Sequence, residues 1–504
     1  MSKNNNVKSK KTKSNFSTAF IDKNILLIIV FLICVLVMHL PFLKADPDTI
    51  VDPNTRGAWT DEGLYTSQIA NYINTGNFDI KENNQFILSP LFNVLIYPFY
   101  RLFGCDIFVS RILVLSFFLL SVFICFMKVE LRTCGLIFIP VALTQYHIFH
   151  FSHYSMPEMI CISWILLAFA SVNKFFYSKN KNSFFIFLSS LMIFFAYCTK
   201  IQFLSSALIL PATMFFYSVK ENKKGKLSSR FKPFLIALVF TFIFFIVYIL
   251  LWYFPEKNFY DTVWAYETEG RFPKNFAHLW QLIKFHAGFT FWIDKLKPLL
   301  IFGGLSLLFL PFIFINKETN KYFGSILFVV FWIIAEFVKV SASYLPYRYL
   351  LALFIAVALL SAMVFSIFFD RYKIFKYFTI ITVSVVLIIN INFIYKSFNN
   401  RTYNIERVNK YLSNYDFTNK TILGVWSHTL ARETNAKCIT VRRNYLNDKQ
   451  SIEKYKPSVI ITEHNEADSD SAFFKQGIIL NNIADSINEF NVWRYKINVC
   501  WLKY

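Results

Sequence analysis

Two adjacent carboxylates, Asp61 and Glu62, are the side chains of this sequence best placed to do chemistry. They lie in the segment Trp59-Thr60-Asp61-Glu62-Gly63-Leu64-Tyr65, after an apolar run from Ile25 to Leu43 that is long enough to cross a bilayer. The polar stretch that follows this run, roughly residues 44 to 88, is too long for a simple turn between spans. Carboxylates on such a platform beside a membrane can accept or donate protons.

The same pair also has a structural interpretation. Apolar residues at helical spacing follow it, so an amphipathic helix is expected to start here: Leu64, Ile69, Ala70 and Ile73. Acidic residues near a helix N-terminus stabilise the helix through its dipole. Catalysis by one carboxylate and helix capping by the other therefore both remain open.

Four further ionisable residues fall at the expected outer ends of apolar runs. Glu158 follows Pro157 where a span begins, which is also an ordinary helix start. Arg348, in Pro346-Tyr347-Arg348-Tyr349-Leu350, offers a fork of donors suited to a phosphate, although an arginine here can also reach lipid headgroups. Arg111 and Lys200 occupy similar positions. An ionisable residue close to the hydrocarbon is a functional candidate.

Histidine and cysteine patterns give no clear metal or redox site. His147, His150 and His153 are spaced so that the first and last point about 120° apart on a helix, which favours packing over a metal site. No CxxC spacing occurs, and we expect no metal ligands, although the sequence does not exclude a divalent cation. Cys438 and Cys500 can pair if the C-terminal region is outside the cell.

The composition requires a membrane protein. The chain has 504 residues, of which 55% are hydrophobic and 61 are Phe, and such a sequence would give a soluble protein an insoluble surface. The formal charge of +21 does not indicate nucleic-acid binding, because Lys and Arg gather in short loops between apolar runs and in a polar N-terminal tail, residues 1–24.

Twelve apolar runs follow one another, at about 25–43, 88–104, 107–127, 134–150, 157–172, 183–199, 201–219, 232–254, 298–316, 322–341, 347–368 and 376–395. The run 88–104 is short and contains Pro90 and Pro98, so it is expected to lie in the membrane interface. Eleven spans then place five basic loops in the cytoplasm, as the positive-inside rule requires. The N-terminus is inside, and the loops 44–106 and 255–297 are outside.

The region after about residue 397 is predicted to be a small extracytoplasmic α/β domain beyond the transmembrane domain, residues 25–396. It alternates polar helical stretches with strand-like runs at Thr421–Trp426, Cys438–Arg442, Ser458–Thr462, Gly477–Leu480 and Arg494–Trp501.

Several of these motifs together resemble the GT-C glycosyltransferases, in the branch of the protein O-mannosyltransferases and aminoarabinose transferases. The resemblance rests on Asp-Glu-Gly-x-Tyr before an amphipathic helix and on Ser-Pro-Leu leading to Leu-Phe-Gly in the first loop. Arg111, Glu158, Lys200 and the Pro-Tyr-Arg-Tyr-Leu motif follow in matching order. The chain departs from the aminoarabinose transferases at Leu88-Ser89-Pro90, where they have Lys-Pro-Pro, and at Glu158, where they often have Asp.

The resemblance implies transfer of a sugar from a polyprenyl-phosphate donor to a protein, lipid or glycan acceptor outside the cell membrane, with inversion. Asp61 would be the general base, and Glu62 and Glu158 would orient the acceptor or the sugar. Arg348 and Tyr349, with Arg111 or Lys200, would bind the lipid phosphate.

Two other functions remain open from the sequence. A flippase or transporter of lipid-linked glycans would be expected to carry charges within several spans, and here Glu336 and Lys339 are the main ones and can pair with each other. An O-antigen ligase or polymerase would be expected to place its functional residues in a large late loop.

Overall fold

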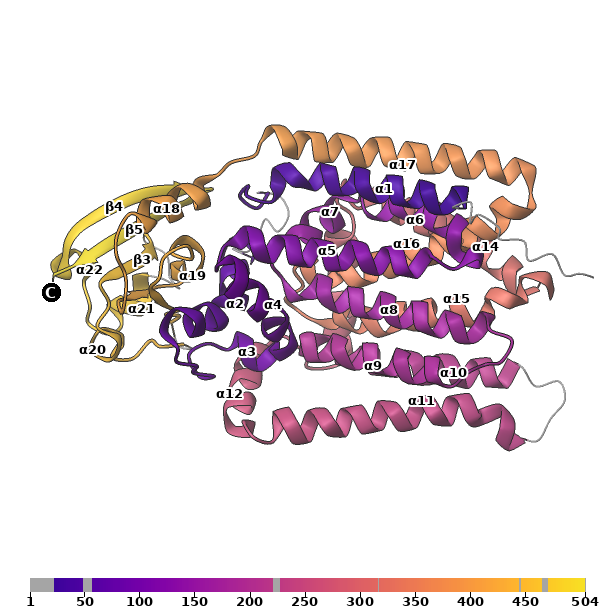
Figure 1. The fold of residues 1–504 in the computed structure, drawn as a ribbon, viewed down its shortest axis with the longest axis horizontal. Helices are drawn as coiled ribbons and strands as arrows, with labels where there is room; N and C mark the ends of the chain where they lie inside the picture. The colour runs from indigo at the N-terminus through magenta and orange to yellow at the C-terminus, as the bar shows by residue number, and fades with distance from the viewer. Residues whose placement is uncertain are drawn as a thin grey trace, which may run out of the picture.

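The protein is a bundle of membrane-spanning helices with a small α/β domain at one end (Figure 1). The structure, a computed structural model, describes residues 22–48, 57–220, 227–315, 317–443, 446–464 and 470–503. Residues 1–21 of the predicted N-terminal tail lie outside these residues.

Nine helical segments in the described parts of the chain are long and apolar enough to cross a membrane, and they coincide with nine of the eleven predicted spans. They are α1 with η1 (Lys23–His39, Leu40–Phe42), α5 (Ile107–Phe126), α8 (Pro157–Tyr177), η3 with α10 (Ile201–Leu208, Ile209–Lys220), α11 with η4 (Leu227–Tyr248, Ile249–Tyr253), α14 (Lys297–Ile315), α15 with η7 (Phe323–Phe337, Val338–Ser341), α16 (Tyr347–Arg371) and α17 (Lys373–Asn399).

The other two predicted spans differ from the expectation. The run 134–150 is not one straight helix, because α6 (Arg132–Ala142) and α7 (Tyr146–His153) meet at 90°. The side chain of Gln145 accepts hydrogen bonds from the backbone N–H groups of His147 and Ile148, which starts a new helix at the bend. The run 183–199 forms α9 (Phe184–Thr199), an apolar helix of 16 residues that is shorter than the nine segments above.

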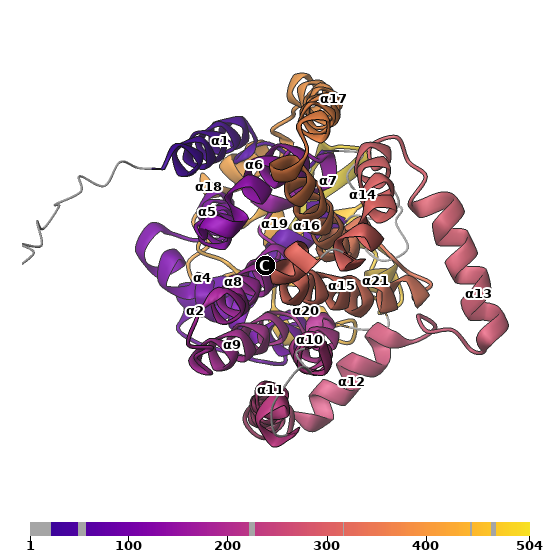
Figure 2. The same ribbon diagram turned by 90° about the vertical axis from the view of Figure 1, so that its right-hand side faces the viewer.

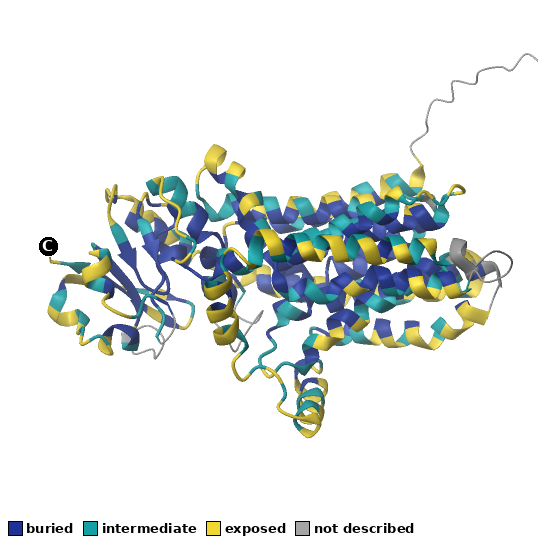
Figure 3. Cartoon of the chain, turned by 90° about the horizontal axis from the view of Figure 1, so that it is seen from below, coloured by how far each residue is buried: buried dark blue, intermediate teal, exposed yellow. Residues whose placement is uncertain are grey.

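Helices α8 and α16 form the centre of the bundle. Within their spanning windows 83% and 94% of the residues are buried, whereas α11 is only 11% buried and so faces the surroundings. Figure 3 shows the same division, with dark blue inner helices and yellow outer faces. Exposed Phe, Leu and Ile side chains on the outer helices are what a lipid environment favours.

The first large loop holds three helices between the bundle and the C-terminal domain: α2 (Gly57–Thr75), α3 (Gln85–Leu88) and α4 (Pro90–Phe103). Helix α4 confirms that the run 88–104 is not a span of its own. It buries Phe92 and Ile96 against the protein and exposes Leu102 and Phe103. The second large loop holds α12 (Lys257–Thr268), α13 (Phe276–Phe285) and η5 (His286–Thr290).

The C-terminal domain is a mixed five-stranded sheet of order β2-β1-β3-β5-β4. Strand β1 pairs in parallel with β2 and β3, and β5 is antiparallel to both β3 and β4. The strands are β1 (Thr421–Leu423), β2 (Lys437–Ile439), β3 (Val459–Glu463), β4 (Ala484–Val492) and β5 (Tyr495–Leu502). The helices are α18 (Asn404–Ser413), α19 (Ser427–Leu430), α20 (Ser451–Tyr455), α21 (Asp470–Phe474) and α22 (Leu480–Ile483). Two short turns of helix remain, η2 (Val129–Leu131) and η6 (Lys317–Tyr322).

One prediction for this domain is wrong. The run Gly477–Leu480 is not a strand, and β4 begins at Ala484, where polar residues at the sheet edge hide the strand pattern. The sequence left open whether Cys438 and Cys500 pair, and in the structure both are free thiols. They lie on β2 and β5, which β1 and β3 separate, so roughly 14 Å of sheet lies between them. A disulfide requires Cα atoms closer than about 7 Å.

The C-terminal domain packs directly on α2. Trp59 of α2 belongs to the domain's core and stacks on Trp493 with ring centres 5.4 Å apart. Gly63 explains how close the two parts approach, because a Cβ atom there would lie 2.5 Å from the hydroxyl of Thr429 on α19. Asn71 and Cys438 exchange two further hydrogen bonds across the contact. The first loop is therefore fixed between the bundle and the domain.

Candidate active site

Asp61 and Glu62 lie inside α2 and face different surroundings. The described helix begins at Gly57, so neither residue is in its first turn, and it does not support a capping role for the pair. Successive residues of an α-helix point about 100° apart. Asp61 lines a cavity, whereas Glu62 points into the protein and is fully buried. The structure therefore separates two residues that the sequence groups together.

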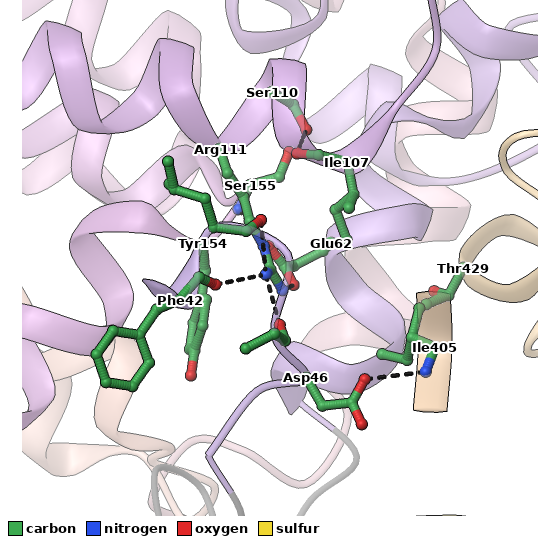
Figure 4. A network of polar contacts seen from close by, with 12 residues as sticks. Phe42, Asp46, Glu62, Ile107, Ser110, Arg111, Tyr154, Ser155, Ile405 and Thr429 are labelled. Carbon is green, nitrogen blue, oxygen red and sulfur yellow. Dashed lines mark hydrogen bonds and ion pairs between the residues drawn. The ribbon is translucent and has the colours of Figure 1, made fainter. Parts of the chain in front are cut away.

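Glu62 forms a buried ion pair with Arg111 of α5 (Figure 4). The Nε and Nη2 atoms of Arg111 donate to the two carboxylate oxygens at 2.9 and 2.5 Å. The backbone N–H of Ser155 also donates to Glu62, at 2.6 Å. Arg111 donates in addition to the carbonyl oxygens of Phe42 and Ala45 after α1. This pair ties four segments of the chain together and has no polar group left over for a substrate.

A second charged cluster joins Asp61, Glu158, Lys200 and Arg348. The Nη2 atom of Arg348 lies 3.0 Å from Oδ2 of Asp61, and its Nε lies 3.9 Å from Oε1 of Glu158. Lys200 donates to the same oxygen of Glu158 at 2.6 Å. Glu158 and Arg348 lie in the first turns of the central helices α8 and α16, so the most buried helices of the bundle hold both residues.

Two tyrosines enclose the amino group of Lys200. Its Nζ lies 4.6 Å from the ring centre of Tyr65 and 5.2 Å from that of Tyr349. It also donates a hydrogen bond to the hydroxyl of Tyr65. Burial, with Glu158 nearby, raises the pKa of Tyr65 well above its usual value, so its phenol stays protonated. Lys200 is thereby held in one position beside the cavity.

The cavity beside this cluster has a volume of about 440 Å³. It lies between α2, η3, α12, the connection from α15 to α16, and the C-terminal domain. Five of its seven charged side chains are basic: Lys200, Arg271, Lys339, Arg348 and Arg442, against Asp61 and Glu267. An excess of positive charge in a partly enclosed site attracts anions. The cavity can therefore hold a molecule that combines an anionic group with polar groups.

Of the predicted site residues, the structure brings Asp61, Glu158, Lys200, Arg348 and Tyr349 to one place, and it puts Glu62 and Arg111 in a separate pair.

Sequence reasoning missed several residues of the cavity. Tyr65 was part of the quoted motif without a role of its own, yet it contacts Lys200. Lys339 does pair with Glu336, at 2.5 Å, but it also lines the cavity. Arg442 comes from the C-terminal domain and Glu267 from the second loop. The positions of Arg442 and Glu267 in the sequence do not predict that they line one cavity, because only the tertiary fold brings them together.

The histidines of α7 are packing residues, as expected. His147, His150 and His153 are all buried, and His153 lies 3.0 Å from His39. Their neighbours are mostly aromatic rings. Across the described part of the chain, no group of three or more His, Cys, Asp and Glu side chains is arranged to hold a metal ion.

Comparison with known proteins gives similarity in structure only. No protein-family model matches the sequence, and no curated protein matches it. ArnT from Cupriavidus metallidurans bound to undecaprenyl phosphate matches with a TM-score of 0.58 and 12% identity, over 94% of this chain and 98% of that one. The archaeal oligosaccharyltransferase AglB from Archaeoglobus fulgidus, in complex with an inhibitory peptide and a dolichol-phosphate, matches with a TM-score of 0.51 and 11% identity, over 87% and 69%.

The structure, together with these two matches, confirms the predicted fold class, an α-helical polytopic membrane protein with a small C-terminal α/β part. Both structures are GT-C glycosyltransferases. At such low sequence identity the similarity describes the path of the chain and not the chemistry of its side chains. The chain thus has the GT-C fold that its first-loop motifs resemble.

Proposed function

We propose that the protein is a membrane glycosyltransferase that moves a sugar from a polyprenyl-phosphate-linked donor to an acceptor, with inversion at the anomeric carbon. The acceptor is a hydroxyl-bearing protein, lipid or glycan at the outer face of the cell membrane. The N-terminus would be cytoplasmic, and the first loop and the C-terminal domain would be extracytoplasmic.

The contact between Asp61 and Arg348 at the cavity wall carries this proposal. A carboxylate that accepts a proton and a guanidinium that binds a phosphate lie 3.0 Å apart, beside a cavity of about 440 Å³. Both side chains are mostly shielded from solvent, 13% and 6% exposed, so their electrostatic effects are stronger than in water. One cavity therefore offers both a proton acceptor and a phosphate-binding group, and a single displacement needs both in the same site.

In the proposed reaction the acceptor oxygen attacks the anomeric carbon while the bond from that carbon to the donor phosphate oxygen breaks. Asp61 accepts the proton of the acceptor hydroxyl. The lipid phosphate leaves with the bonding electron pair, and Arg348 and Lys200 stabilise its negative charge. Attack from the face opposite the phosphate inverts the anomeric centre.

Arg348 contacts Asp61 directly, so a donor phosphate that binds Arg348 would change the surroundings of the base. A phosphate competes with Asp61 for the donors of Arg348, since Arg binds phosphate in a fork geometry. Asp61 then becomes available to the acceptor hydroxyl. Glu158 would act indirectly by holding Lys200 and Arg348, and Glu62 would fix α2 through Arg111.

The proposal is tested by measuring sugar transfer with purified protein in lipid and a synthetic polyprenyl-phosphate sugar donor. Asp61→Asn keeps the size and the hydrogen bonding of the side chain but cannot accept the proton. We expect transfer to fall at least about a hundredfold, which is what a positioned base contributes. Melting curves for both proteins should stay close together.

Two results would contradict this assignment. Near-normal transfer by Asp61→Asn would remove the base role from this residue. A loss of transfer in Glu62→Gln without a loss of stability would move that role to Glu62.

A further inference from the structure

The second large loop carries an exposed aromatic surface on α13 and the residues that follow it. Its members are Phe276, Trp280, Phe285, Phe289 and Trp292, and each exposes between 51% and 79% of its surface. None of the residues of α13 is buried. An aromatic surface of this size in water would be unfavourable and normally marks a binding surface.

The position of α13 indicates what covers this surface. Figure 2 looks along the spans and shows α13 lengthwise at the outside of the bundle, across their direction. The segment leads directly into the span α14, whose Ile301 and Leu308 are also strongly exposed. The exposed apolar surface therefore continues from a helix parallel to the membrane plane onto a lipid-facing span.

Basic residues accompany the aromatic ones. Lys284 lies with its Nζ 5.3 Å from the ring centre of Trp280, and Lys297 lies 5.8 Å from that of Trp292. Helices with Trp and Phe on one side and Lys beside them lie in the membrane interface, with the cations at the level of the lipid phosphates. We propose that α13 and η5 form an interfacial helix that inserts its aromatic side chains into the outer surface of the lipid bilayer.

This membrane contact would also hold one wall of the cavity. Residues before and after α13 bind the connection between α15 and α16: the backbone N–H of Ser343 donates to the carbonyl oxygen of Arg271, and His286 contacts the carbonyl oxygen of Ala342 at 2.8 Å. The same connection contributes Ala342 and Tyr344 to the cavity and leads into Arg348. The lipid surface and the cavity wall are thus joined through α13.

Trp280 provides a direct test of the membrane contact, which does not depend on the proposed function. Protein in phosphatidylcholine vesicles is compared with Trp280→Phe, and the difference in fluorescence gives the contribution of Trp280. We expect lipids brominated near the headgroup to quench this contribution at least about twofold more than lipids brominated near the chain end, as for an interfacial side chain. Aqueous iodide should quench it weakly.

Trp493→Phe is the matched control, because Trp493 stacks on Trp59 within the C-terminal domain. Its contribution should not respond to brominated lipids at either depth. Quenching of Trp280 by iodide alone would overturn the proposal, since α13 would then lie in water. Protection from both quenchers would show that protein covers the surface, for example a second copy of this chain, and deep quenching would show insertion into the hydrocarbon; both overturn it.

Discussion

The two neighbouring carboxylates of α2 are bound to arginine in different ways. Glu62 and Arg111 are each about 1% exposed and share two short hydrogen bonds, and further backbone groups occupy the remaining donors and acceptors. Asp61 and Arg348 share one contact at 3.0 Å beside a cavity, and Arg348 also lies near Glu158. The first pair is enclosed by its own protein, and the second has space beside it for another molecule.

This difference explains why one pair suits structure and the other suits chemistry. A buried ion pair with every group satisfied holds one arrangement, and breaking it leaves a charge without a partner in a dry environment. A pair at a cavity can exchange one partner for a ligand at little cost, because the ligand supplies new charge and hydrogen bonds. We therefore expect substitutions in the first pair to reduce stability and those in the second to reduce transfer.

Glu62→Ala should have the largest effect on stability. It leaves the guanidinium of Arg111 buried without its carboxylate, which costs about 3–5 kcal/mol. Thermal melting of the purified protein in detergent measures the loss. Asp61→Ala serves as the control, and we expect it to cost only about 1 kcal/mol because Asp61 lies at a cavity. Equal losses from the two substitutions would contradict the distinction between the pairs.

Arg348→Ala should chiefly affect transfer. Loss of one preorganised charged donor at a developing negative charge costs about 3–4 kcal/mol of transition-state stabilisation. Arg348→Lys should restore only part of the rate, because a lysine lacks the fork geometry. The measurement is kcat/KM for the lipid-linked donor. Normal transfer by Arg348→Ala would mean that Arg348 contacts lipid headgroups or only packs.

Much of the fold could be predicted because the membrane imposes simple rules. Apolar length marked nine spans, and two prolines with short length marked α4 as a separate helix. The bend at Gln145 was missed, since periodicity alone does not distinguish a span from two helices at an angle. Strand β4 was missed because edge strands with one exposed face carry few apolar residues.

The candidate site was predicted in part, for a physical reason. An ionisable residue at the end of an apolar run has few explanations, so Glu158, Lys200 and Arg348 stood out, and Asp61 stood out in the motif of the first loop. Sequence spacing did not show that Glu62 points away from Asp61, or that Arg111 is its partner, because both depend on how α2 is rotated against α5. Arg442 could not be found at all, since the C-terminal domain has many basic residues in its sequence.

Glu82, another carboxylate of the first loop, can be compared with Asp61 and Glu62, because its cation lies farther away. It is 3% exposed, it forms an ion pair with Lys437 at 3.9 Å, and it accepts a hydrogen bond from Asn71. Burial raises the pKa of Glu82 to about 7 from an ordinary value of 4.5, and Lys437 offsets only part of this effect. The two buried carboxylates therefore differ in the distance to their cation, which is 3.9 Å for Glu82 and 2.5 Å for Glu62.

A raised pKa in the folded protein means that folding takes up a proton between about pH 4.5 and 7. The neutral side chain is tolerated at low pH, and stability is lost as the pH rises through this range, by an amount on the order of 3 kcal/mol. Glu82→Gln keeps the acceptor for Asn71 without the charge. It should therefore melt like the unmodified protein near pH 4.5 and at a higher temperature near pH 8. The same pH dependence in both proteins would show that Glu82 is ionised at little cost, and that its contacts with Asn71 and Lys437 compensate its burial.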